Sequence, residues 1–202
     1  ISCTAKLKTF IEGQLAAQYP KSLIINTKDY LPDILENTLT LSLGQMKLMS
    51  GFLYPLKSHT EFKDVDPLSS LLSVLSKAQP NDKIVIQYLL NPVGSSWQKS
   101  GHKAVENKNK DAEGVSHTNP YSKVITQKIS FHGFKTAIRI SINSETKERS
   151  SQLLYETANS YSSFNNPGGN SLGFKKLYLW QRTRMIRAML KRSKRFAPSH
   201  QI

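Results

Sequence analysis

The hydrophobic positions change their period once within residues 62–97, and this change predicts a helix followed by a strand. Asp66 and Pro67 are typical of a helix start, because the carboxylate can accept an unpaired amide proton and proline needs no amide partner there. From residue 83 to residue 91 the apolar side chains are nearly continuous, which indicates a central strand buried on both faces. The expected helix carries leucines at the i, i+3, i+4, i+7 spacing of a single face: Leu68, Leu71, Leu72 and Leu75.

The remaining hydrophobic pattern predicts further helices and strands on both sides of this unit. Periodic apolar residues predict a helix over 5–18. Alternating residues predict strands over 38–48 and 134–142, and shorter apolar runs predict strands over 22–27 and 52–59. A helix is expected over 145–164, with a stripe formed by Leu153, Leu154, Thr157, Ala158, Tyr161 and Phe164.

This order of elements predicts an α+β fold with a mainly antiparallel sheet, built as two ferredoxin-like α/β sandwich halves plus a C-terminal basic amphipathic helix. The first half is expected at 1–97 and the second at 123–165. Residues 98–122 are polar, and we expect a mobile insertion there, whose first half could form a surface helix and whose mobile loop lies at 107–120. The Gly- and Asn-rich residues 166–173 predict a linker, and residues 174–202 are assigned to the basic helix and tail.

The charge of the chain is concentrated near its C-terminus. The whole sequence has 28 Lys and Arg, 14 Asp and Glu, and a net charge of +14. Residues 157–202 contain nine basic side chains and no acidic one, so they contribute +9, and the first 156 residues contribute the other +5. Such a balance is typical of a protein that meets a polyanion, although it says nothing about the fold.

Few residue patterns in the sequence point to catalysis. The phosphate-cradling G-x-x-x-x-G-K-[S/T] motif does not occur, and the histidines lie at no metal-binding spacing. Asp66 is better explained as a helix cap than as a general acid, and Cys3, the only cysteine, is expected in a buried strand. No run of apolar residues is long enough to span a membrane. We therefore expect that this chain is not an enzyme, and that it binds no cofactor or metal.

The strongest candidate for binding is the basic segment 174–195. At 100° per residue, one arc of this helix collects apolar side chains and the opposite arc collects cations. The apolar arc could pack on the protein itself, insert into a membrane surface, or leave the cations to bind a polyanion such as nucleic acid. The residues expected to bind a membrane or a polyanion are Lys175, Lys176, Tyr178, Trp180, Arg184, Arg187, Lys191, Arg192, Lys194 and Arg195.

Three stretches of the chain resemble one protein family. They are the helix-to-strand stretch 66–90, the segment Glu12-Gly13-Gln14-Leu15-Ala16-Ala17-Gln18-Tyr19-Pro20, and the strand and helix from Gly133 to Asn165. Together they look like the N-terminal, non-ATPase region of the conjugative, TraC-like ATP-binding proteins of bacterial type IV secretion systems. The resemblance covers most of residues 1–177. The first residue is Ile1 rather than Met, and we interpret the chain as part of a longer protein.

The resemblance implies an accessory domain that precedes an ATPase motor. ATP and Mg²⁺ would then bind only in a downstream domain. The expected role is oligomer assembly and docking to the membrane-embedded secretion machinery, in the cytoplasm at the inner face of the membrane. The expected partners are the protein's own ATPase domain and other secretion subunits, with an anionic membrane as a further candidate. The alternatives are a nucleic-acid-binding module of a DNA-processing protein and a membrane-peripheral scaffold.

Overall fold

The computed structural model describes residues 1–62, 66–106, 109–110, 116–117 and 119–193. The chain divides into two compact units, Ile1–Tyr30 and Leu31–Ile202. In the first unit, a short 3₁₀ turn (η1, Ala5–Leu7) leads into helix α1 (Lys8–Gln18), which confirms the helix predicted over 5–18. The strand predicted over 22–27 is wrong, and Cys3 is exposed rather than buried. No side chain of this unit is buried.

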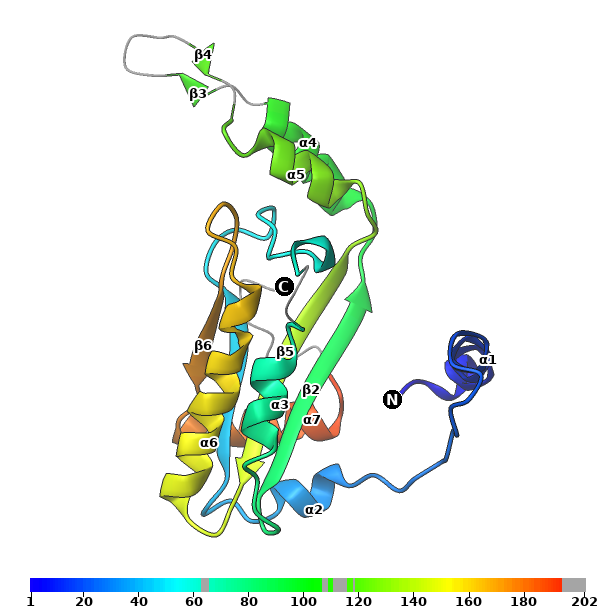
Figure 1. Cartoon of the computed structure of the whole chain (residues 1–202), viewed down its shortest axis with the longest axis vertical. Helices are drawn as coiled ribbons and strands as arrows, with labels where there is room; N and C mark the ends of the chain where they lie inside the picture. The colour runs from blue at the N-terminus through cyan, green and yellow to red at the C-terminus, as the bar shows by residue number, and fades with distance from the viewer. Residues whose placement is uncertain (63–65, 107–108, 111–115, 118, 194–202) are drawn as a thin grey trace. The chain divides into compact units, whose positions relative to one another are not determined.

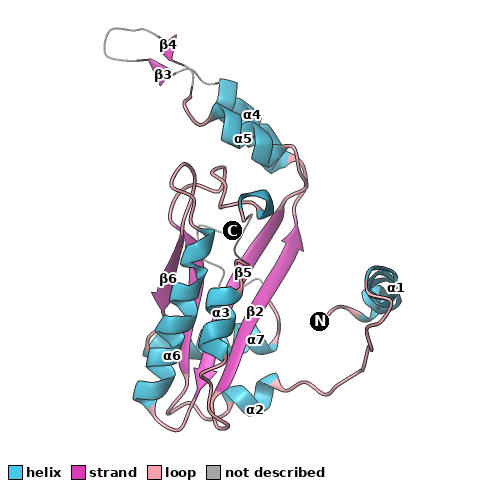
Figure 2. Cartoon of the chain, in the orientation of Figure 1, coloured by secondary structure: helices cyan, strands magenta, loops and turns pink. Residues whose placement is uncertain are grey.

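The second unit is organised on a single four-stranded sheet (Figures 1 and 2). The strands are β1 (Ser42–Leu48), β2 (Lys83–Pro92), β5 (Phe134–Asn143) and β6 (Leu172–Lys176). Their order is β2-β5-β1-β6, and each neighbouring pair is antiparallel. Helix α3 (Ser69–Leu75) connects β1 to β2, and helix α6 (Lys147–Asn159) connects β5 to β6. This is the β-α-β-β-α-β order of a ferredoxin-like fold.

The α+β class and the antiparallel sheet are therefore confirmed. The division into two halves at 1–97 and 123–165 needs correction, because strands from both segments share one sheet. β2 and β5 pair along their whole length, from Lys83 opposite Asn143 to Pro92 opposite Phe134. The two segments thus build one ferredoxin-like unit. The prediction that residues 83–91 form a central strand buried on both faces is wrong, because β2 is an edge strand of the sheet. Val85 is its buried side chain, whereas Tyr88 is 48% and Leu90 is 62% exposed.

One face of the sheet packs against α6 and α3 (Figure 1). Helix α6 begins where the Thr146 hydroxyl accepts a hydrogen bond from the Arg149 amide at 3.2 Å, and the 3₁₀ turn η3 (Ser160–Phe164) extends it. The helix predicted over 145–164 is thus confirmed. The core on this face is formed by Met46, Ile138, Ile140, Ile142, Leu153, Leu154, Ala158 and Tyr161.

The leucine stripe predicted for α3 is wrong in its direction. Val74 is the buried side chain of this helix, whereas Leu72 is 56% exposed and Leu68 is 45% exposed. Asp66 accepts a hydrogen bond from the Leu68 amide at 2.8 Å, which stabilises the turn before α3, but the N-cap of the helix is Leu68 rather than the predicted Asp66.

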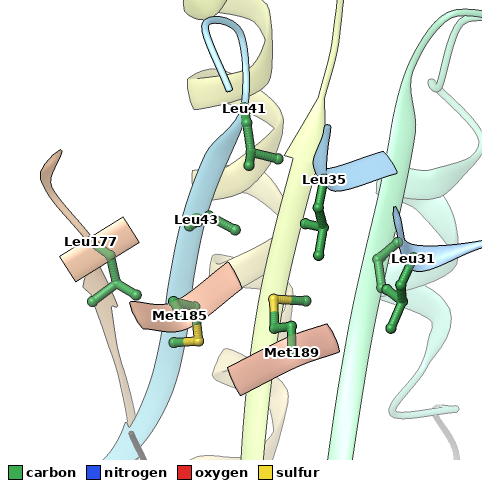
Figure 3. Close-up of a cluster of buried hydrophobic side chains, with 8 residues drawn as sticks. Leu31, Leu35, Leu41, Leu43, Leu177, Met185 and Met189 are labelled. Carbon is green, nitrogen blue, oxygen red and sulfur yellow. The ribbon is translucent and has the colours of Figure 1, made fainter. Parts of the chain in front are cut away.

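The other face of the sheet is covered by helices α2 (Leu31–Leu35) and α7 (Leu179–Leu190). Figure 3 shows Met185 of α7 near Leu43 of β1, and Met189 of α7 near Leu35 of α2, all within one cluster of buried side chains. Both methionines are fully buried, while Ile186 and Leu190 are partly buried against the same cluster. The apolar arc of the basic helix therefore packs on its own protein.

The predicted linker at 166–173 is an ordered turn followed by a strand. The Asn170 side chain is buried: its Oδ1 accepts from the Ser50 amide at 2.9 Å and its Nδ2 donates to the Gly51 carbonyl at 3.0 Å. These bonds fasten the 166–171 turn to the end of β1, and residues 172–176 then form β6. Helix α7 consequently begins at Leu179, not at Phe174.

The polar insertion is a helical hairpin at its base. Helix α4 (Ser96–Glu106) follows β2, and helix α5 (Ser122–Ile129) precedes β5. The two helices pack against each other. Two short strands, β3 (Asn109–Lys110) and β4 (Ser116–His117), pair between them. The surface helix expected in the first half of the 98–122 insertion is therefore confirmed as α4, while much of the 107–120 loop lies outside the described residues. The strand predicted over 52–59 is absent, and that segment forms turns before η2 (His59–Glu61).

Candidate functional site

A cleft of about 1570 Å³ lies where the helical hairpin meets the sheet. Its walls come from the 51–61 segment, the adjoining ends of β2 and β5, and the first turns of α4 with the last turns of α5. Aromatic side chains contribute prominently to the lining, and Phe131 and Phe134 are 67% and 54% exposed. Exposed apolar side chains gathered in a concave surface are typical of a binding site. The aromatic members are Phe52, Trp97, Phe131 and Phe134.

Two glycines allow the hairpin to pack closely beside the cleft. A Cβ atom at Gly101 would lie 2.5 Å from Ile129 Cγ2, so α4 and α5 approach closely only because residue 101 has no side chain. A Cβ atom at Gly133 would lie 2.6 Å from Trp97 Cε2. The Gln98 amide group donates to the Ile129 carbonyl at 2.8 Å, which joins the start of α4 to the end of α5. The hairpin is thus fixed where it borders the cleft.

Lys128 is a half-buried cation that lines the cleft. Its Nζ donates to the Phe52 carbonyl at 2.6 Å and to the Tyr54 carbonyl at 3.1 Å, and so ties α5 to the 51–61 segment. Burial lowers the pKa of Lys128 to about 8. The Tyr54 ring also meets the Tyr121 ring edge-to-face, with centroids 5.2 Å apart. These contacts hold the far wall of the cleft in place.

Charged and polar side chains also line the cleft. They include the Lys128 ammonium, which is bonded to two carbonyls, together with Glu61, His132 and Lys135. Over the described part of the chain, no three His, Cys, Asp or Glu side chains come together as a metal site. Within the same residues, no helix combines the length and apolarity needed to cross a membrane.

The structure separates the residues predicted to bind a membrane or a polyanion. Lys175 and Lys176 belong to strand β6. Tyr178 and Trp180, at the start of α7, are 65% and 68% exposed. Arg192 is half-buried and donates to the Leu190 carbonyl at 3.1 Å. The exposed cations of α7 are Arg184, Arg187 and Lys191, whereas Lys194 and Arg195 lie outside the described residues.

A buried arginine that the sequence did not reveal holds the end of α7. Arg139 of β5 is fully buried and donates to the Ala188 carbonyl at 3.2 Å and to the Ser193 carbonyl at 2.7 Å. Gln87 of β2 accepts from Arg139 at 3.1 Å and donates to the Met189 carbonyl at 3.1 Å. Burial lowers the pKa of Arg139. A cation at the C-terminal end of a helix is favoured, because the last carbonyls carry negative partial charge.

The sequence pattern around Arg139 indicated a solvent-exposed side chain. Arg139 alternates with Ile138 and Ile140, which is typical of a strand with one solvent-exposed face. The pattern that could have predicted its burial is the amphipathic segment 179–190. The apolar arc of that helix needs a surface to pack on, and the second face of the sheet provides it.

The fold and the cleft define an α+β domain of the β-α-β-β-α-β type, with a helical hairpin inserted between the edge strand β2 and the central strand β5. The chain belongs to a family described as a domain of unknown function, DUF8128, whose sequence profile matches residues 2–198. No curated protein and no solved structure matches the chain.

Proposed function

We propose that this chain is a non-catalytic accessory domain of a type IV secretion-like ATPase, which acts in assembly and docks to the membrane-embedded machinery from the cytoplasmic side. The family assignment is silent on function, so the proposal rests on the resemblance of residues 1–177 and on the cleft. ATP and Mg²⁺ would be bound by a downstream domain of the same protein.

The observation that carries the proposal is the apolar cleft beside the helical hairpin. Its volume of about 1570 Å³ exceeds the ~300–1,000 Å³ typical of small-molecule pockets. An open surface of this size, with half-exposed aromatic side chains, fits a segment of another protein better than a metabolite. The favoured occupant is an apolar segment of the downstream ATPase domain, from the same subunit or from a neighbouring one in the oligomer.

The first test is the coding sequence beyond Ile202. A G-x-x-x-x-G-K-[S/T] motif in the following domain is expected. Its absence from the full-length protein would remove the proposal. By itself the 1–202 chain should show no micromolar ATP affinity in calorimetry with Mg²⁺.

The second test uses the full-length protein and two matched surface substitutions. Phe131→Ser alters an exposed apolar side chain of the cleft, and Leu72→Ser alters one on α3, away from the cleft. Sedimentation with ATP should show that Phe131→Ser lowers the oligomer fraction while Leu72→Ser leaves it intact. Equal assembly of both variants would show that the cleft has no part in docking.

A further inference from the structure

A second concave surface lies along the outer edge of strand β6, and the docking function does not use it. This edge groove, of about 460 Å³, is lined by Tyr155, Phe174, Lys175, Lys176, Tyr178 and Trp180. Three elements meet there: α6 supplies Tyr155, β6 supplies the phenylalanine and both lysines, and the start of α7 supplies the other two aromatic residues. The groove combines aromatic rings and ammonium groups with no carboxylate among its lining residues.

The rings of the groove fall into a fixed part and a free part. Tyr155 and Phe174 meet edge-to-face with centroids 5.7 Å apart, and the Lys176 ammonium lies 5.1 Å from the centre of the Tyr155 ring. Lys176 also donates to the Ser151 hydroxyl at 3.3 Å, so this inner part is held in place. Tyr178 and Trp180, in contrast, are about two-thirds exposed, at 65% and 68%. Their flat faces are available to stack on a planar ligand.

Positive charge extends from the groove along α7. Arg184, Arg187 and Lys191 are exposed at the i, i+3, i+7 spacing of a single helical face. At a rise of ~1.5 Å per residue these cations span about 10 Å of the helix. No acidic residue occurs between Thr157 and Ile202, so the sequence places no carboxylate within this stretch to neutralise them. Such a row matches the repeated charges of a phosphate backbone.

The packing of α7 makes a lipid surface the weaker partner. Insertion into a bilayer would use the apolar arc of α7, but Met185 and Met189 are fully buried against the sheet. What remains accessible is a concave aromatic groove next to a row of cations. A concave groove receives a base between its rings, whereas interfacial insertion into lipid uses protruding side chains.

We propose that the edge groove and the outer face of α7 bind single-stranded nucleic acid. Tyr178 and Trp180 stack on unpaired bases, and Lys175 with the exposed cations of α7 contacts the phosphates. The preference for single strands follows from the rings, because bases in a duplex are already stacked on one another. The binding is expected to be tolerant of sequence, because every base presents a π-face.

The test titrates the chain into fluorescein-labelled oligothymidine and oligouridine and follows anisotropy. Removing one stacking ring should weaken binding by about 5- to 100-fold, so Tyr178→Ala and Trp180→Ala should each lose affinity to that extent. Tyr19→Ala is the matched control, because Tyr19 is also 65% exposed but lies in the first unit. Unchanged circular dichroism of both variants will show that the loss does not come from unfolding.

Charge and partner class are tested in the same assay. Lys175→Ala should lower the slope of log affinity against log salt by about 0.7, the value for one single-strand phosphate contact, while Lys83→Ala on the opposite sheet edge should not. Binding to a duplex of the same length should be weaker than to the single strand. The proposal is overturned by equal loss in Tyr178→Ala and Tyr19→Ala, by duplex binding as tight as single-strand binding, or by binding to phosphatidylserine vesicles without binding to oligonucleotides.

Discussion

Met189→Ala is the substitution that tests most directly how α7 is held. Met189 is fully buried between α7 and the sheet, and truncation removes its Cγ, Sδ and Cε atoms. At about 0.8 kcal/mol for each buried methylene-sized group, the lost burial amounts to roughly 2 kcal/mol. The cavity left in a packed core adds to this, so the free energy of unfolding should fall by about 2–5 kcal/mol.

The matched control is Arg187→Ala, two residues away on the exposed face of the same helix. Because Arg187 is exposed, its truncation should change the free energy of unfolding by less than ~0.5 kcal/mol. Urea unfolding followed by circular dichroism and by tryptophan fluorescence measures both variants. A slope of ~1–3 kcal/mol per molar puts the expected midpoint shift of Met189→Ala above about 0.7 M. Similar midpoints for the two variants would refute the packing of α7 on the sheet.

Three further substitutions probe other contacts. The Arg149 guanidinium lowers the pKa of Asp82 from 3.8 to about 2, so this carboxylate stabilises the fold above pH 3.8 and loses that effect toward pH 2. Arg149→Gln should remove this effect, so that the urea midpoint falls less steeply between pH 3.8 and pH 2 than in the wild type. Burial lowers the pKa of Lys128 from 10.5 in the unfolded chain to about 8 in the folded one. Between pH 8 and pH 10.5 the unfolded state therefore binds more protons, and the free energy of unfolding should rise with pH. The same rise in Lys128→Met would contradict this assignment. Gly133→Ala should displace the Trp97 indole, lower the free energy of unfolding by about 1–3 kcal/mol and red-shift the tryptophan emission. An emission spectrum identical to that of the wild type would disprove this prediction.

Periodicity predicted the elements of the second unit better than it predicted their surroundings. The alternation in 134–142 located β5, but alternation shows only that two faces differ, not whether the polar face is solvent-exposed. Arg139 is therefore on the expected face and yet fully buried, because α7 covers it. In α3, the leucine spacing defined an arc, but Val74 rather than Leu72 faces the core, so the spacing alone did not identify the buried side of this short helix.

The two candidate sites show the same limit. The lining residues of the cleft come from segments nearly 120 positions apart in sequence, so no local pattern could collect them. Asn170 looked like part of a flexible linker because Asn and Gly favour turns, and its bonds to the 50–51 backbone depend on a contact across the fold. By contrast, the basic residues near the start of α7 were found from sequence, because a charge run without acids is visible in one dimension.

The pairing of Pro92 with Phe134 has a consequence for how this family can vary. These residues lie directly opposite each other in the sheet, and everything from 93 to 133 leaves and returns at this one point. Neighbouring antiparallel strands can be closed by a turn of as few as ~2 residues. The pairing of β2 with β5 therefore does not depend on the length of the 93–133 segment, and a change in that length could leave the strand order of the sheet unchanged.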